Sequence, residues 1–193
     1  DNLVLRLDEK LADLEWSIGI DSGQQGAIAI LHHSQYHSIY DLPMTTTLVN
    51  GRRKIELDEV ALDILIRDIQ ADLNGGSAIW ALEKIWARNV SDQYGNRNKD
   101  IVSQGNQLRD YGIIRGALRT LIGDYRLVAP ATWKAKVLAN IPKTCDPKDQ
   151  SILYVSHNFP NAPLLRSSRH RKPCDGRADA LCIAQYNLLD KLT

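Results

Sequence analysis

Residues 16–31 read WSIGIDSGQQGAIAIL, and this stretch decides the fold. An apolar run ends at Asp21, a short glycine-containing turn follows, and extended sequence resumes at Ala27. This pattern predicts two strands joined by a tight turn, with a carboxylate at the end of the first strand. A third strand is predicted around 36–42, and Asn50-Gly51 predicts a further turn. The chain therefore begins as an antiparallel meander.

After residue 57 the sequence changes from strand-like to helix-like periodicity, interrupted by short apolar runs. Strands are predicted at 77–82 and 125–128, and the polar segment 84–99 is predicted to be a surface loop. Helices are predicted at 58–73, 101–122, 130–138, 147–154 and 175–191. We therefore expect an α/β fold with a mixed five-stranded sheet, first antiparallel and then parallel, flanked by helices.

The bulk composition fits one folded domain of 193 residues. Residues 14–193 are predicted to form this domain, and 1–13, with leucines spaced by four, an N-terminal helical extension. The net charge is only +1, so composition alone does not indicate a nucleic-acid-binding protein. The three cysteines form no CxxC pair, which predicts free thiols in a reducing compartment. No stretch is long and apolar enough to predict a membrane span.

Four acidic residues stand where a mixed sheet would bring them together. Asp21 ends the first strand, Glu83 ends the fourth, and Asp175 and Asp179 begin the last helix, one turn apart on one face. Carboxylate oxygens without neighbouring His or Cys favour Mg²⁺, or Mn²⁺, over zinc. Two such ions can activate a water and stabilise the leaving oxygen of a phosphodiester. The four acids are therefore candidate metal ligands and catalytic residues.

Each acid also has a structural interpretation when taken alone. Asp21 before Ser-Gly can open a turn, and Glu83 can be a surface residue at a strand end. Asp175 is well placed to cap the last helix. Asp179, in the apolar stretch Ala-Asp-Ala-Leu, fits a purely structural role least well. The order and setting of the four, rather than any one of them, indicate a metal site.

The order strand-Asp, strand-Glu, helix Asp-x-x-x-Asp resembles the RuvC family of Holliday-junction resolvases in the RNase H-like superfamily. The matching segments are IGIDSG at 18–23 with GAIA at 26–29, EKIW at 83–86, and DGRADAL at 175–181 with IA at 183–184. The resemblance covers about residues 16–187. It implies an RNase H-like fold and a homodimeric, Mg²⁺-dependent endonuclease that cuts four-way DNA junctions. It also implies two ions per site, held by the four acids named above.

The resemblance also implies DNA-binding roles for further residues, and the sequence departs from the family pattern at one point. Lys134 and Lys148 stand at positions where the family has phosphate-contacting lysines, and Trp86 where members can have an aromatic that wedges into the junction. Both lysines could equally be solvated, and Trp86 could pack in a core or interface; Tyr94 is a weaker stacking candidate. The last two acids are four apart rather than three, which is similar to the organellar and phage-type branch. This spacing leaves open whether Asp175 or a neighbour such as His170 completes the metal shell.

A basic tract leads directly into the acidic helix. Residues 166–173 read RSSRHRKP, although the whole chain is almost neutral. A basic loop beside a carboxylate cluster suits a phosphodiesterase, because the loop can hold backbone phosphates; a solvated loop is the alternative. The candidate DNA-binding residues here are Arg169, His170, Arg171, Lys172 and Arg177.

Other functions share parts of this pattern. Asp21-Ser22-Gly23 after a strand also resembles the phosphate loop of actin-like ATPases and sugar kinases, but those need two related domains and 193 residues are too few. Nucleases for RNA–DNA hybrids, transposase-like cores and rRNA-processing enzymes share the acidic geometry, and a catalytically inactive junction-binding protein keeps the fold. A resolvase should be a two-fold dimer, because a four-way junction needs two symmetric cuts. We expect the helix with Gly112 and Gly116 at that interface.

Overall fold

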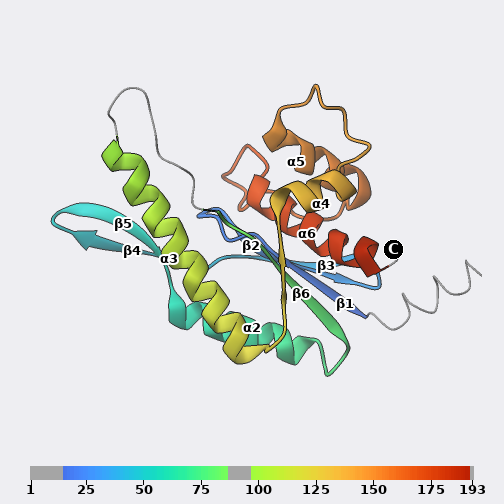
Figure 1. Ribbon diagram of the computed structural model, residues 1–193, viewed down its shortest axis with the longest axis horizontal. Helices are drawn as coiled ribbons and strands as arrows, with labels where there is room; N and C mark the ends of the chain where they lie inside the picture. The colour runs from blue at the N-terminus through green and yellow to red at the C-terminus, as the bar shows by residue number, and fades with distance from the viewer. Residues whose placement is uncertain (1–14, 87–96, 192–193) are drawn as a thin grey trace, which may run out of the picture.

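A computed structural model describes residues 15–86 and 97–191 (Figure 1). The predicted 1–13 helix and Tyr94 lie outside the described residues. Within them, no helix combines the length and the apolar character needed to cross a membrane. The strands are β1 (Trp16–Ile20), β2 (Ala27–His32), β3 (Gln35–Asp41), β4 (Met44–Val49), β5 (Arg52–Leu57), β6 (Ala78–Glu83) and β7 (Arg126–Val128). The helices are α2 (Glu59–Asp72), α3 (Arg97–Leu121), α4 (Pro130–Val137), α5 (Pro147–Asn158) and α6 (Asp175–Lys191).

The central sheet has five strands in the order β3-β2-β1-β6-β7. The pairs β1–β2 and β2–β3 are antiparallel, whereas β1–β6 and β6–β7 are parallel. The predicted architecture, a mixed five-stranded sheet that begins as an antiparallel meander, continues with parallel strands and is flanked by helices, is confirmed. The central strand β1 and its neighbour β6 both carry an acid at their carboxyl ends.

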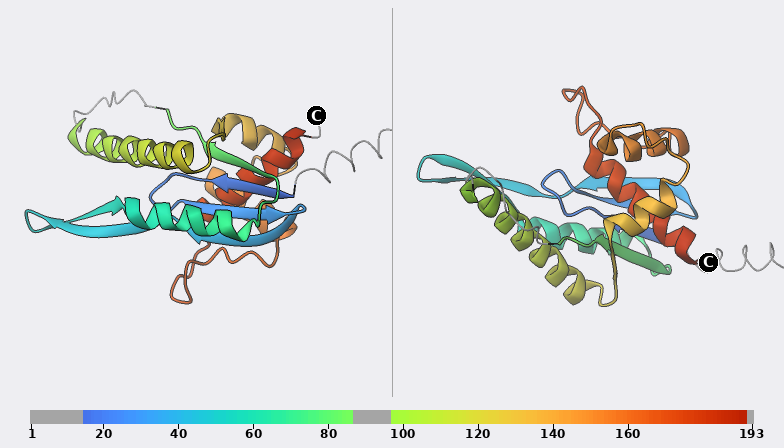
Figure 2. Two further views of the ribbon diagram at one scale, coloured as in Figure 1. Left: turned by 90° about the horizontal axis from the view of Figure 1, so that it is seen from below. Right: turned by 45° about the horizontal axis from the view of Figure 1, so that its top comes forward.

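Helices cover both faces of this sheet: α2 and α3 lie on one side, and α4, α5 and α6 on the other (Figures 1 and 2). Alternation along β1 sends Ile18 and Ile20 into the core beneath α2 and α3. Gly19 faces the other way, where a Cβ would overlap the backbone carbonyl oxygen of Ala180 in α6. The glycine thus allows the backbones of β1 and α6 to touch, which fixes the position of α6 on the sheet.

A second sheet, formed by β4 and β5, projects beyond the main sheet as a long hairpin beside α3 (Figures 1 and 2). The predicted turn at Asn50-Gly51 is confirmed, since both residues have the positive φ angles, 51° and 73°, of a hairpin turn. Glu56 of β5 accepts a hydrogen bond from Arg109 of α3 at 2.6 Å. This ion pair ties the hairpin to the helix.

The element boundaries differ from the predictions mainly at helix ends. α3 begins at residue 97 rather than 101, and α5 continues to residue 158 rather than 154. The cysteines are free, as predicted: Cys145 is half-buried, and Cys174 and Cys182 are buried.

Candidate active site

The sheet register places Asp21 and Glu83 side by side. In the parallel pair β1–β6, Ile20 lies opposite Leu82, so the next residue of each strand is one of these acids. Side chains alternate along a strand. Because Gly19 and Ala81 both face α6, the two acids point to that same face. The first part of the predicted cluster therefore follows directly from the sheet.

Helix α6 begins against the turn that follows Asp21. A Cβ at Gly176 would overlap the carbonyl oxygen of Gln25 and lie 2.9 Å from Oδ2 of Asp21. Asp175 precedes this glycine, and Asp179 follows one helical turn later on the same face. The structure thus brings the first turns of α6 to the strand ends, as the sequence predicted.

The charges of the four acids act on one another. Burial, followed by the charges of Glu83 and Asp179, raises the pKa of Asp21 from 3.8 to about 8; Asp175 contributes a smaller rise. Burial is also the main cause that raises the pKa values of Glu83 and Asp179. Buried carboxylates that repel one another favour a proton or a cation. The donor set, made of hard oxygens, fits Mg²⁺ or Mn²⁺.

The carboxylates are not drawn tightly together. Within the described parts of the chain, no three of these acids bring one oxygen each within 4.8 Å of the others; Glu15, His32 and His33 form the group that meets this criterion. Mutual repulsion accounts for a wider spacing of the acids.

Two residues outside the predicted set, together with the predicted Lys134, support the acids. The indole of Trp133, fully buried in α4, donates a hydrogen bond to Oε1 of Glu83 at 2.9 Å. A hydrogen bond from buried Ser151 of α5 lowers the pKa of Asp179, against the larger effect of burial. The positive charge of Lys134 lowers the pKa of both carboxyls. Periodicity alone could not reveal Trp133 and Ser151, since their role depends on how α4 and α5 pack over the strand ends.

Replacing Trp133 with phenylalanine should lower metal-dependent cleavage about 10- to 100-fold, the usual cost of losing a partner that orients a metal ligand. Phenylalanine keeps an aromatic ring of smaller volume, a loss that the control below also has, but Glu83 loses its donor and its pKa rises further, so the loss of cleavage should be greatest at low pH. The measurement is a pH series of cleavage rates. Trp80→Phe is the control, because Trp80 is equally buried on the opposite face of the sheet. An equal loss in both variants would contradict the orienting role.

The predicted basic surface lies beside Asp175. A pocket of about 620 Å³ is lined by Asp175, Lys148 and the basic loop, including Arg169, His170, Arg171 and Lys172. These loop residues are exposed, and so is Lys148. Nδ1 of His170 lies 2.8 Å from the hydroxyl of Ser167. The fold thus brings Lys148 and the basic loop, far apart in sequence, to one side of the acids.

The structure corrects our expectation for Arg177. Its guanidinium is buried, with 8% of the residue exposed, and it forms a two-pronged ion pair with Asp41 at 2.7 and 2.9 Å. It also donates to the carbonyl oxygens of Pro163 and Leu165. Helical geometry explains the difference: two residues after Asp175, Arg177 points to another side of α6. Arg177 holds the basic loop to β3 and is not available to DNA phosphates.

Trp86 lies three residues after Glu83 and is 60% exposed. The ammonium group of Lys84 lies 3.8 Å from the centre of its ring, in a cation–π contact. Among the described residues, Trp86 therefore does not pack in the core. A flat, exposed aromatic is available near the acids.

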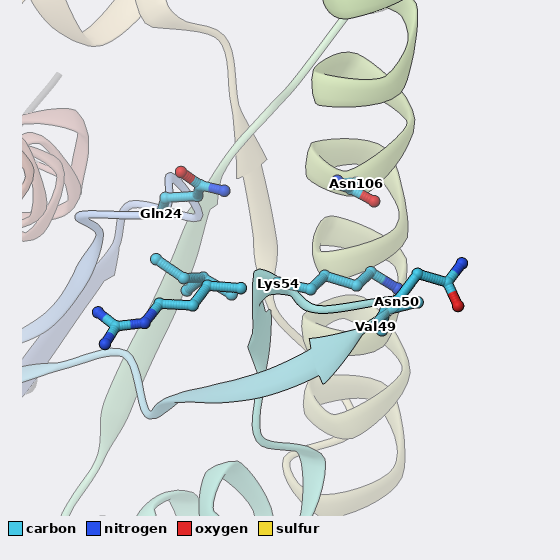
Figure 3. Close-up of a pocket in the computed structure, with 7 residues that line it drawn as sticks. Gln24, Val49, Asn50, Lys54 and Asn106 are labelled. Atoms are coloured by element: carbon cyan, nitrogen blue, oxygen red, sulfur yellow. The ribbon is translucent and has the colours of Figure 1, made fainter.

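A second groove, of about 910 Å³, lies between the β1–β2 turn, the β4–β5 hairpin and α3 (Figure 3). Gln24, three residues after Asp21, lies at one side, and Asn106 of α3 at another. The hairpin contributes Asn50, Arg53 and Lys54. The sequence analysis missed this surface because only its turn, and not the projecting hairpin, was predicted. The groove thus reaches the turn that follows Asp21, at Gln24, whereas the basic pocket reaches Asp175.

No protein-family model and no curated protein matches this chain. Among solved structures, T. thermophilus RuvC in complex with a Holliday junction substrate is similar, with 11% sequence identity and a TM-score of 0.49. A second structure of Thermus thermophilus RuvC has 15% identity and a TM-score of 0.44. Each similarity covers 92% of this chain and 96% of the other.

Proposed function

We propose that this protein is a metal-dependent endonuclease that cuts four-way DNA junctions as a symmetric dimer. The observation that carries the proposal is the convergence of four acids from three elements. The parallel register aligns Asp21 with Glu83, and the glycine contact at the start of α6 brings Asp175 and Asp179 to them. Half-buried acids that repel one another destabilise a fold, so their presence together favours a functional role.

Asp21, Glu83, Asp175 and Asp179 would hold the divalent ions, two Mg²⁺ in each site, with Mn²⁺ as a substitute. When bound, the ions supply an activated water and stabilise the leaving oxygen of the phosphodiester. The chain's own residues prepare the site. Trp133 orients the Glu83 carboxylate, and Lys134 favours the ionised form of two ligands, which is the form that binds metal. Lys134 is also near enough to the cluster to contact a phosphate.

The surfaces on either side of the acids would position the DNA strands. Lys148, Arg169, His170, Arg171 and Lys172 would contact backbone phosphates in the basic pocket. The groove beside the hairpin would hold a neighbouring arm, with Arg53 and Lys54 as additional phosphate contacts. The exposed ring of Trp86 would stack on a base at the crossover, an interaction worth about 1–3 kcal/mol per base.

A dimer follows from the symmetry of the substrate, because resolving a junction needs two cuts related by a two-fold axis. Helix α3 is the proposed interface. Gly112 and Gly116 are exposed on it, and a Cβ at either position would meet nothing within 4 Å in this chain. A partner helix could therefore approach its backbone closely. This geometry would also explain the two glycines, which disfavour an isolated helix.

The test compares three substrates in Mg²⁺: a synthetic four-way junction, a nicked duplex and an RNA–DNA hybrid. We expect the junction to be cut in preference. Glu83→Gln should abolish cutting and leave junction binding largely intact, because it removes a metal ligand but no DNA-contacting residue. Glu59→Gln, an exposed acid at the start of α2, is the matched control and should cut normally.

Each alternative function has its own outcome in this experiment. Preferential cleavage of the hybrid would replace the junction proposal with an RNase H-like or RNA-processing activity. Junction binding without cleavage in Mg²⁺ or Mn²⁺ would indicate an inactive junction-binding protein. Equal loss of binding and cutting in Glu83→Gln would contradict the role assigned to this residue.

A further inference from the structure

A second group of potential metal ligands lies at the other end of β1, away from the acids. Glu15 directly precedes β1, whereas Asp21 directly follows it. His32 ends β2, and His33 begins the turn to β3. One ligand atom from each of Glu15, His32 and His33 lies within 4.8 Å of the others, and Oε1 of Glu15 is 3.4 Å from Nε2 of His32. This group is separate from the proposed nuclease site.

The backbone holds Glu15 from both sides. Its carbonyl oxygen accepts a hydrogen bond from the amide of His33 at 2.9 Å, and its amide donates to the hydroxyl of Ser77 at 3.3 Å. Gly76 leaves room for the carboxylate, because a Cβ there would overlap Oε2 of Glu15 and lie 2.6 Å from Nε1 of Trp16. The backbone of Glu15 is thus held by neighbouring strands, and its side chain is half-buried.

The two histidines are also fixed. The ring of His32 stacks on the indole of Trp16, with the centroids 4.0 Å apart and the planes at 21°. His33 and Ser34 form the turn with positive φ angles of 45° and 65°, a conformation that favours glycine or asparagine. The chain nevertheless has a histidine at this position. One nitrogen of each imidazole lies within 4.8 Å of a Glu15 carboxylate oxygen.

One atom in this group points to a ligand. Nε2 of His32 is buried and, among the described residues, has no hydrogen-bond partner; its distance to the Glu15 carboxylate is 3.4 Å, but the geometry is not that of a hydrogen bond. A buried polar atom without a partner has lost its hydrogen bonds to water without replacement, which is unfavourable. A cation shared by this nitrogen, the carboxylate and the second imidazole would remove that cost.

We propose that Glu15, His32 and His33 bind a divalent transition-metal ion of the Zn²⁺ class. Two imidazoles and one carboxylate form a known zinc ligand set, whereas Mg²⁺ prefers oxygen ligands alone. Bonds of about 2.0–2.1 Å in tetrahedral geometry place ligand atoms about 3.4 Å apart. The Glu15–His32 pair already has this spacing, and His33 needs a small adjustment. The bound ion would link the residue before β1 to the β2–β3 turn.

The test is zinc binding, measured by calorimetry and by the shift in melting temperature on adding Zn²⁺ to the metal-free chain. His33→Asn removes the imidazole but suits the positive φ angle. It should weaken zinc binding by at least about tenfold, since even partners behind a metal ligand contribute that much. Ser34→Asn is the matched control: it changes the other turn residue, equally compatible with its φ angle, and should bind zinc normally.

Two further variants separate this site from the acids. Glu15→Gln should weaken zinc binding as His33→Asn does, whereas Asp21→Asn should leave it unchanged. The proposal would be overturned if the wild type neither bound zinc nor melted at a higher temperature with it. It would also be overturned if zinc binding were unchanged in both Glu15→Gln and His33→Asn. Loss of the zinc effect in Asp21→Asn alone would also overturn it, because zinc would then occupy the acid cluster. None of these readouts requires nuclease activity.

Discussion

Asp21→Asn is expected to abolish metal-dependent cleavage and, at the same time, to raise the melting temperature of the metal-free protein. The carboxylate is the most strongly perturbed acid of the cluster, with a pKa raised to about 8 by burial and by its acidic neighbours. Asparagine keeps the shape and the oxygen that accepts the hydrogen bond from Gly23. It removes the carboxyl group whose ionisation the fold opposes and which, in the proposed function, binds metal. Activity and stability should therefore change in opposite directions.

The raised pKa of Asp21 determines at which pH values Asp21→Asn stabilises the fold. In the unfolded chain Asp21 ionises near pH 3.8, whereas in the folded chain it holds its proton to about pH 8. Its contribution thus destabilises the fold progressively as pH rises from about 4 to about 8. The shift corresponds to a few kcal/mol near neutral pH, at about 1.4 kcal/mol per pKa unit. The rise in melting temperature caused by Asp21→Asn should be small at pH 4, several degrees at pH 7, and largest at pH 8.

Thermal melts at several pH values, with and without Mg²⁺, test this prediction. Mg²⁺ should raise the melting temperature of the wild type at pH 8 and have little effect on Asp21→Asn. Asp68→Asn, which neutralises an exposed acid of α2, is the control and should change neither melting nor cleavage. A lower melting temperature for Asp21→Asn at pH 8 would contradict the proposed conflict between charge and fold.

The acids could be found from the sequence because each rule involved is local. Asp21 and Glu83 each end a short apolar run, and Asp175 and Asp179 have helical spacing. A meander followed by alternating helices and strands then makes β1 and β6 neighbours. What the sequence could not supply was the packing of glycine backbones that brings α6 to these strands.

Other features depend on tertiary contacts that no local rule predicts. Arg177 stands next to a basic tract in the sequence, but its partner Asp41 is 136 residues away. Trp133 contacts Glu83 across 50 residues. The β4–β5 hairpin follows the meander without joining its sheet, so its turn could be predicted but not its direction. In each case the sequence showed the position of the residue along the chain, but the direction of its side chain in the fold could not be predicted from it.

Gly176→Ala should lower both stability and cleavage, because it acts where α6 meets the turn after Asp21. The added Cβ would overlap the carbonyl oxygen of Gln25 and lie 2.9 Å from Oδ2 of Asp21. The turn cannot easily move, since Gly26 donates to the carbonyl oxygen of Gly23 at 2.7 Å and a Cβ at Gly26 would itself overlap the carbonyl oxygen of Asp21. The start of α6 must therefore shift away from β1, carrying Asp175 with it.

Two opposing contributions determine whether Gly176→Ala stabilises or destabilises the fold. Alanine is intrinsically better than glycine in a helix by about 0.5–1 kcal/mol. Overpacking costs typically about 1–3 kcal/mol, so the net free energy of unfolding should fall. A displacement of about 1 Å at a catalytic group can cost about a hundredfold in rate, and we expect a loss of that order. Gly105→Ala in α3 is the control, because a Cβ there meets nothing within 4 Å and only the intrinsic gain remains. If Gly176→Ala were as stable and as active as Gly105→Ala, the contact between α6 and the β1–β2 turn would not be what assembles the four acids.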